Sequence, residues 1–115
     1  MIYIWLDDVR KPPEGHDWIW VKDAKTALQE LRLAAIGNDH ITISFDHDLG
    51  QDENGKDLPS GYDVANHIEK AAHGGLTYNI INWNVHSANP VGYKRITAAM
   101  QRFDKVQWKT VHPND

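Results

Sequence analysis

Polar side chains that can do chemistry follow three short apolar segments of this 115-residue chain. Seven of them stand directly behind these segments: Asp7, Asp8, Asp46, His47, Asp48, His86 and Ser87. Carboxylates and imidazoles are costly to bury, so we expect them at the open ends of strands. The carboxyl ends of strands in an α/β sheet are also where ligands bind. The three groups therefore predict one site at one edge of a sheet, although a polar turn closed by Leu49 and Gly50 would explain the second group alone.

Four of these residues are aspartates, and carboxylates so close together repel one another unless a positive charge lies near them. Arg10, Lys11 and Lys109 are available as counter-charges, but a bound divalent cation is the simpler solution. Oxygen ligands favour Mg²⁺ or Mn²⁺, and added histidine ligands would admit a transition metal. The expected metal ligands are Asp7, Asp8, Asp46 and Asp48. The alternative is that single aspartates cap helices or pair with arginine.

The segment after His86 joins a strand end to the start of a helix. Asn89 followed by Pro90 is a strong start signal, with an amide cap and a proline at the first helical position. Free N–H groups and the positive end of the helix dipole favour an anion there, and a glycine lets a ligand approach closely. We expect these residues to bind a phosphate: Arg10, Tyr62, Ser87, Asn89 and Gly92. An ordinary helix cap is the alternative.

Two histidines, His47 and His86, would flank that phosphate. Opening a cyclic phosphate requires a base that activates water and an acid that protonates the departing oxygen, and imidazole suits both roles. We expect both histidines to be catalytic, assisted by Asp46 and Asp48. Neighbouring carboxylates should raise the pKa of His47, and the helix dipole should lower the pKa of His86, which would then be the base. The alternative is that His47 only bonds the aspartates and His86 fills a strand end.

The elements that must position these residues alternate along the chain. Alternation and β-branched or aromatic runs predict strands over residues 2–6, 17–21, 41–45, 78–85 and 105–109. Caps and apolar stripes predict helices over residues 23–36, from 60 to about 73, and from 90 onward. Residues 51–59 form a polar loop. The order β-β-α-β-α-β-α-β predicts an α/β domain with a mostly parallel five-stranded sheet and about three helices.

The predicted strands also define two different sheet faces. Each crossover can place its helix on the same face, which would leave the other face bare. The bare face would carry two aromatic and four polar residues: Tyr3, Trp5, Thr42, Ser44, Asn82 and Asn84. Ile81 and Trp83 would lie on the covered face. An exposed aromatic patch is typical of a partner surface, so we expect a homodimer through this face.

Composition limits the class of protein. The length suits a single domain over residues 1–115. The formal net charge of −4 argues against an extended duplex nucleic acid as partner, and leaves a small phosphorylated ligand or an RNA end. No cysteine is present, which excludes disulfides, thiolate metal sites and a cysteine nucleophile. No apolar run approaches the length of a membrane span and no signal peptide opens the chain, so we expect a cytoplasmic protein without a membrane partner.

Four segments taken together resemble a known family. They are residues 5–13 (WLDDVRKPP), 43–50 (ISFDHDLG), 60–65 (SGYDVA) and 86–92 (HSANPVG). In this order they resemble the cyclic-phosphate processing receiver-like domain, an offshoot of response-regulator receivers with a flavodoxin-like sheet. The resemblance implies processing of cyclic phosphates in RNA repair or in nucleotide-based conflict systems. The chain would then be a metal-assisted phosphoesterase, a cyclic phosphodiesterase or hydrolase, acting on an RNA end or a cyclic nucleotide.

Two other functions remain open. A phosphoacceptor receiver needs an acidic pair, an acceptor aspartate, a hydroxyl group and a lysine at successive strand ends. Five residues can be placed on that pattern: Asp7, Asp8, Asp46, Ser87 and Lys109. Signalling does not require the additional His47, Asp48 and His86, and two helices of such receivers have no predicted counterpart in the sequence. The third function is that of a non-catalytic protein that sequesters a cyclic nucleotide.

Overall fold

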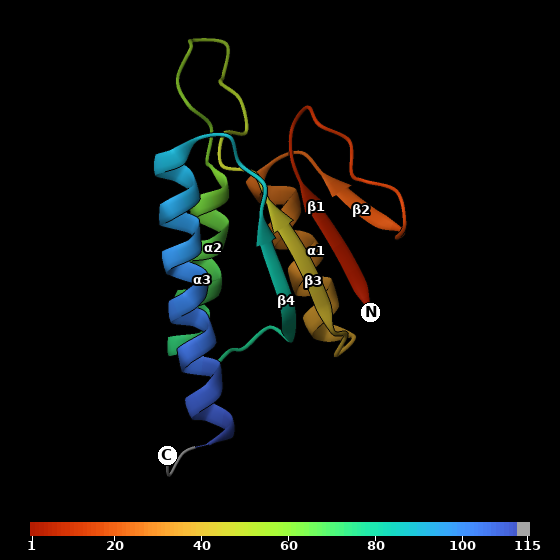
Figure 1. The fold of residues 1–115 in the computed structure, drawn as a ribbon, viewed down its shortest axis with the longest axis vertical. Helices are drawn as coiled ribbons and strands as arrows, with labels where there is room; N and C mark the ends of the chain where they lie inside the picture. Colours follow the sequence, from red (N-terminus) through yellow and green to blue (C-terminus); the bar gives the residue numbers. More distant parts are fainter. Residues whose placement is uncertain (113–115) are drawn as a thin grey trace.

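The computed structural model describes residues 1–112 as a four-stranded sheet with three helices. The elements follow the chain in this order: β1 (Ile2–Leu6), β2 (Trp18–Val21), α1 (Ala24–Ile36), β3 (Ile41–Phe45), α2 (Gly61–His73), β4 (Ile80–Val85) and α3 (Pro90–Val111). All strand pairs are parallel, and the strand order is β2-β1-β3-β4 (Figure 1). No helix within residues 1–112 is both long and apolar enough to cross a membrane. The predicted α/β class with a parallel sheet and three helices is confirmed.

Local signals in the sequence explain where the helices begin. The Asp23 carboxylate accepts a hydrogen bond from the Thr26 N–H (2.7 Å) and caps α1. The Asp63 carboxylate accepts from the Ser60 N–H (2.7 Å), which completes the capping box of α2. Asn89 caps α3, with Pro90 at the first helical position as predicted.

The predicted fifth strand is wrong. Residues 105–109 belong to α3, which runs on past the end of the sheet (Figure 1). The buried face of α3 includes Met100 and Phe103, and Val106 follows it one turn later, packed against the same core. No glycine or proline interrupts residues 93–112, so nothing stops the helix before the supposed strand.

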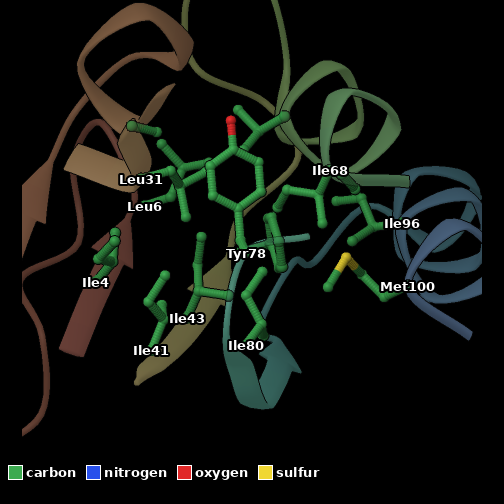
Figure 2. Close-up of a cluster of buried hydrophobic side chains, with 14 of the residues drawn as sticks. Ile4, Leu6, Leu31, Ile41, Ile43, Ile68, Tyr78, Ile80, Ile96 and Met100 are labelled. Carbon is green, nitrogen blue, oxygen red and sulfur yellow. The ribbon is translucent and has the colours of Figure 1, made fainter. Parts of the chain in front are cut away.

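A single hydrophobic core lies between the sheet and the helices (Figure 2). Ile4, Leu6, Ile41, Ile43 and Phe45 are fully buried on the covered face of the two central strands. Their neighbours along each strand point to the opposite face, as the period of a strand requires. The strand residues are therefore divided between the two sheet faces as predicted, with one exception in β4.

The exception is Ile81, which was expected on the covered face. The register of β4 against β3 shifts at this point, so Ile41 pairs with Ile80 and Thr42 pairs with Asn82. Ile81 is the extra residue of this bulge and is 55% exposed. Asn82 and Asn84 consequently lie opposite Thr42 and Ser44, on the helix-free face.

The connection from β1 to β2 contains no helix, as the sequence predicted. Residues 7–17 return along the sheet, and His16 stacks on Tyr3 with ring centroids 4.1 Å apart. A helix at this point would cover the second sheet face. Because a short loop replaces it, that face remains without helices in the described part of the chain.

Candidate functional site

Strand register brings the predicted site residues to one edge of the sheet. Leu6, Phe45 and Val85 are aligned as the last residues of their strands. The ladder then continues for one more residue, because the Asp46 N–H donates to the Leu6 carbonyl (2.8 Å) and the His86 N–H donates to the Phe45 carbonyl (2.9 Å). Asp7, Asp46 and His86 are therefore lateral neighbours, as the sequence predicted.

Three of the four predicted carboxylates converge at this edge. Oxygen atoms of Asp7, Asp8 and Asp46 all lie within 4.8 Å of one another. Asp7 is 3% exposed, and one of its oxygens accepts hydrogen bonds from the N–H groups of Val9 (2.9 Å) and Arg10 (2.7 Å). Burial raises the pKa of Asp46, and the neighbouring carboxylates of Asp7 and Asp8 raise it further, against the lowering effect of the His47 N–H. Within residues 1–112, no lysine or arginine forms an ion pair with these three carboxylates.

Asp48 lies outside this acidic group. Its carboxylate accepts from His47 Nδ1 (2.9 Å) and from the Asn89 side-chain amide (3.3 Å). The hydrogen bond from His47 lowers the pKa of Asp48, and the bond from Asn89 lowers it further. Asp48 thus holds the imidazole of His47 and ties the loop after β3 to the start of α3.

His86 is locked in place by four contacts. Its ring stacks on Trp5 at a centroid distance of 3.9 Å and an angle of 3°. Nε2 lies 3.1 Å from an Asp7 oxygen and Nδ1 lies 2.8 Å from the Ser44 hydroxyl, while the Arg10 guanidinium reaches its carbonyl (3.3 Å). Burial lowers the pKa of His86, against the raising effect of Asp7. The direction agrees with the sequence prediction, but the cause is burial rather than a helix dipole.

These contacts fix the tautomer of His86. A carboxylate only accepts hydrogen bonds, so a neutral ring must donate its Nε2–H to Asp7. Nδ1 then accepts the Ser44 hydroxyl proton. Neither ring nitrogen of His86 is left for a substrate.

His47 presents the opposite case. Its ring packs against the first turn of α3 so closely that a Cβ atom at Gly92 would overlap it. Nδ1 bonds Asp48, whereas Nε2 is buried and has no partner among the described residues. If Nδ1 carries the proton that Asp48 accepts, Nε2 carries the free lone pair.

The start of α3 is already capped from within. The Asn89 side-chain oxygen accepts from the N–H groups of Val91 and Gly92, both at 3.1 Å. The Asn89 N–H donates to the Ser87 hydroxyl oxygen (3.1 Å), so the Ser87 hydroxyl proton remains available. Gly92 is needed to admit the His47 ring, whereas the sequence suggested that it admits a ligand.

The remaining predicted ligand contacts lie on either side of the acidic group. Arg10 is exposed and reaches over His86. Tyr62 packs in the first turn of α2, with the Arg95 guanidinium 3.9 Å from its ring centroid. Lys109 lies in the last turn of α3, roughly 30 Å along the helix from its start at 1.5 Å per residue. The lysine that a phosphoacceptor site requires is therefore at the wrong end of the molecule.

Three residues that matter to the site were not singled out as site residues from the sequence. Ser44 and Trp5 hold the His86 ring, and Gly61 lets α2 pass over β3, because a Cβ there would overlap the Asp46 carbonyl. Ser44 and Trp5 share the sheet face that leads to Asp46 and Asp7, which is a signal present in the strand alternation. The requirement for Gly61 depends on packing between elements and has no comparable signal.

Comparison with family models gives one match. The model of the Cyclic-phosphate processing Receiver domain matches residues 2–102. The comparison with curated proteins found no match, and neither did the comparison with solved structures. The matched range covers all four strands, the acidic group and both site histidines.

Proposed function

The chain belongs to the cyclic-phosphate processing receiver domain family, and from this membership and the site geometry we propose that it is a metal-assisted phosphoesterase that opens a cyclic phosphate. The observation that carries the proposal is the group formed by Asp7, Asp8 and Asp46 at the ends of two adjacent parallel strands. Three carboxylates without a lysine or arginine partner favour a divalent cation.

The acidic group fits Mg²⁺ or Mn²⁺. Its carboxylate oxygens lie within 4.8 Å of one another, and carboxylate oxygens are the protein ligands that these hard cations prefer. The bound cation would neutralise charge that develops on the phosphate oxygens. This ligand set differs from the expected one, because Asp48 is engaged with His47 instead.

His86 serves as the positioning residue for Asp7. Its Nε2–H holds one carboxylate oxygen (3.1 Å) while backbone N–H groups hold the other. Such second partners orient metal ligands, and their loss typically weakens metal affinity about 10- to 100-fold. We assign His86 this role in place of the expected proton transfer, because both of its ring nitrogens are occupied.

His47 is the proton-transfer residue in this proposal. In the reaction, a water oxygen bonds to phosphorus, one P–O ester bond of the ring breaks, and the product is a phosphate monoester. His47 Nε2 takes the proton of the attacking water, Asp48 stabilises the imidazolium through Nδ1, and the departing oxygen is protonated by solvent. Because Nε2 is buried, the loop after β3 must move when water enters. The exposed Arg10 guanidinium and the Ser87 hydroxyl bind the phosphate oxygens.

The test is phosphorus NMR of product formation from 2′,3′-cyclic nucleotides and cyclic dinucleotides, with EDTA, Mg²⁺ or Mn²⁺. We expect metal-dependent turnover of a cyclic phosphate. Replacement of Asp7→Asn and Asp46→Asn together should abolish turnover and the metal-induced rise in melting temperature. That rise reflects a stabilisation of the folded state by about 2.7 kcal/mol at a metal concentration 100-fold above Kd. A matched control removes two exposed carboxylates elsewhere, Asp17→Asn with Glu14→Gln. Equal stability and turnover with and without metal would contradict the metal role.

A non-catalytic, cyclic-nucleotide-sequestering function is the second candidate. It is favoured by the burial of His47 Nε2 and by the occupied nitrogens of His86, which together leave no exposed imidazole nitrogen at this site. The same NMR experiment separates the two functions. A ligand that binds and stays unchanged supports sequestration, and a covalent aspartyl phosphate would revive the receiver alternative.

A further inference from the structure

A groove of about 430 Å³ runs along the helix-free face of the sheet. Nine of the residues that line it come from the four strands: Tyr3, Trp5, Trp18, Thr42, Ile43, Ser44, Ile81, Asn82 and Asn84. No helix within residues 1–112 contributes a lining residue. The size suits one small flat ligand, since ligand pockets start at about 300 Å³.

The two walls of the groove differ in chemistry. One wall is aromatic, where Trp18 packs edge-on against Tyr3 (5.4 Å) and Trp5 (5.6 Å). The opposite wall carries the exposed side chains of Asn82 and Asn84 on β4. Between the walls the floor consists of small side chains of β3, because Thr42 and Ser44 pair with these two asparagines.

This lining selects the class of ligand. Among the described residues that line the groove, His16 is the one side chain that can carry a charge near neutral pH, and none is Asp, Glu, Lys or Arg, so the groove favours a neutral occupant. Aromatic rings bind flat π systems. Each asparagine amide offers a donor and an acceptor side by side, the pattern that pairs with the edge of a nucleobase. A neutral, flat ring with hydrogen-bonding edges meets all three conditions.

The groove leads directly into the candidate site. On β1, β3 and β4 the groove residue nearest the carboxyl end is followed two positions later by a site residue on the same side: Trp5 by Asp7, Ser44 by Asp46, and Asn84 by His86. Trp5 stacks on His86, and the Ser44 hydroxyl bonds the same ring at 2.8 Å. Two residues of strand span about 7 Å, which is comparable to the separation of base and phosphate within one nucleotide.

We propose that this groove binds the base of a nucleoside that carries the cyclic phosphate. The substrate is then a nucleoside 2′,3′-cyclic phosphate, free or at the end of an RNA strand. The base lies between the aromatic wall and the amides, while the phosphate reaches the acidic group. The placement of the phosphate at the acidic group rests on the proposed function, whereas the placement of the base depends only on the groove.

Binding is tested with adenosine, which has no phosphate. Titration should shift the side-chain amide signals of Asn82 and Asn84 and the indole N–H signal of Trp18 in ¹H–¹⁵N NMR spectra. Thr42→Phe should abolish these shifts, because the larger side chain fills the floor of the groove. Asn82→Ala should weaken binding about tenfold. Gln101→Ala on the exposed side of α3 is the control and should bind as the wild type does.

Enzyme kinetics tests the binding of the base and the hydrolysis of the phosphate separately. Asn82→Ala should raise KM for 2′,3′-cyclic AMP about tenfold with kcat unchanged. The same variant should leave hydrolysis of glycerol 1,2-cyclic phosphate, which has no base, unaltered. If no cyclic phosphate is hydrolysed but adenosine binds and Thr42→Phe prevents it, the groove assignment stands and the proposed hydrolysis fails.

Two results would overturn the groove assignment. The first is equal kcat/KM for the nucleoside and glycerol substrates together with no adenosine-induced shifts at millimolar concentration. The second concerns a homodimer through this face, which the sequence suggested. If light scattering shows that Thr42→Phe converts a dimer to a monomer while adenosine binding stays unchanged, the face is a dimer interface and the groove assignment is wrong. Circular dichroism that matches the wild type shows that each variant is folded.

Discussion

The two faces of the sheet are built from the same strands and differ in almost every other respect. On the covered face Ile4, Ile43 and Phe45 are fully buried beneath three helices. On the helix-free face Ser44 alternates with Ile43 and Phe45, and Asn84 lies opposite it on β4. The covered face stabilises the fold, and the helix-free face offers the exposed side-chain amides of Asn82 and Asn84.

The histidines repeat this difference. His86 continues the helix-free face, where Trp5 and Ser44 hold it. His47 lies toward the helices, wedged against the first turn of α3 beside Gly92. Helix α3 therefore holds the imidazole of His47 at the site, while residues of the helix-free face orient the imidazole of His86. The two histidines therefore have different roles because different faces of the sheet hold them.

The largest expected contrast is between these two histidines. His47→Gln should lower kcat about 10²- to 10⁴-fold, because a proton-transfer residue contributes by that factor, and added metal should not restore it. His86→Gln should instead weaken metal affinity about 10- to 100-fold, and saturating Mn²⁺ should restore most of the rate. Turnover measured across a metal titration separates the two variants. Rescue of both variants by metal, or of neither, would remove the division of roles between the faces.

The next contrast compares adjacent residues of β3 that point to opposite faces. Ile43→Ala should lower the free energy of unfolding by about 2–5 kcal/mol, because it opens a cavity in the core. Thr42→Ala should cost about 1 kcal/mol or less, since its side chain borders the open groove. Urea unfolding monitored by circular dichroism gives both values. Similar losses for the two variants would show that the helix-free face also carries the stability of the fold.

A smaller effect is expected where the helices press on the site. Gly61→Ala and Gly92→Ala should each cost about 1–3 kcal/mol, because the new methyl groups overlap the Asp46 carbonyl and the His47 ring. Gly74→Ala at the end of α2 is the matched control, because a Cβ there makes only ordinary contacts, the nearest at 3.5 Å. Gly92→Ala should also shift the His47 ring signals in NMR spectra. Unchanged His47 signals would show that the ring is not held by α3.

The smallest predicted effect tests the polar contacts on the helix-free face. Ser44→Ala should lower the free energy of unfolding by about 1 kcal/mol, the net value of a typical hydrogen bond, and should alter the ¹⁵N signal of His86 Nδ1. Thr42→Val removes a hydroxyl from the same face that does not contact His86, so its Nδ1 signal should stay at the wild-type position. An unaltered His86 signal in Ser44→Ala would mean that the hydroxyl does not fix the tautomer.

The sequence predicted the two faces because alternation along a strand is a local property. Ile41, Ile43 and Phe45 are separated by Thr42 and Ser44, and each residue lies on the face that its position requires. The bulge in β4 could not be predicted in this way, because it depends on pairing with β3. The prediction of a fifth strand failed for a related reason, since Val106 fits both the strand alternation with Trp108 and the helical stripe that continues from Phe103.

The sequence predicted which residues of the candidate site lie next to one another better than it predicted the role of each residue. Parallel strands with aligned ends bring Asp7, Asp46 and His86 together wherever their sequence places them. The separation of Asp48 from the acidic group depends on how the loop after β3 meets α3, which only the packed structure determines. The same packing leaves one ring nitrogen of His47 without a partner and occupies both nitrogens of His86.

The placement of the tryptophans gives the protein two independent optical signals. Three of the five tryptophans, Trp5, Trp18 and Trp20, lie on β1 and β2 with their side chains on the helix-free face, whereas Trp83 packs against the core and Trp108 lies on α3. In a variant with Trp83→Phe and Trp108→Phe, intrinsic fluorescence therefore reports on the groove side of the sheet, while far-ultraviolet circular dichroism reports mainly on the helices that cover the other side. Coincident unfolding curves from the two signals would show that both sides melt as one cooperative unit. Separate curves would show that the aromatic side loosens first, with the helical layer still folded.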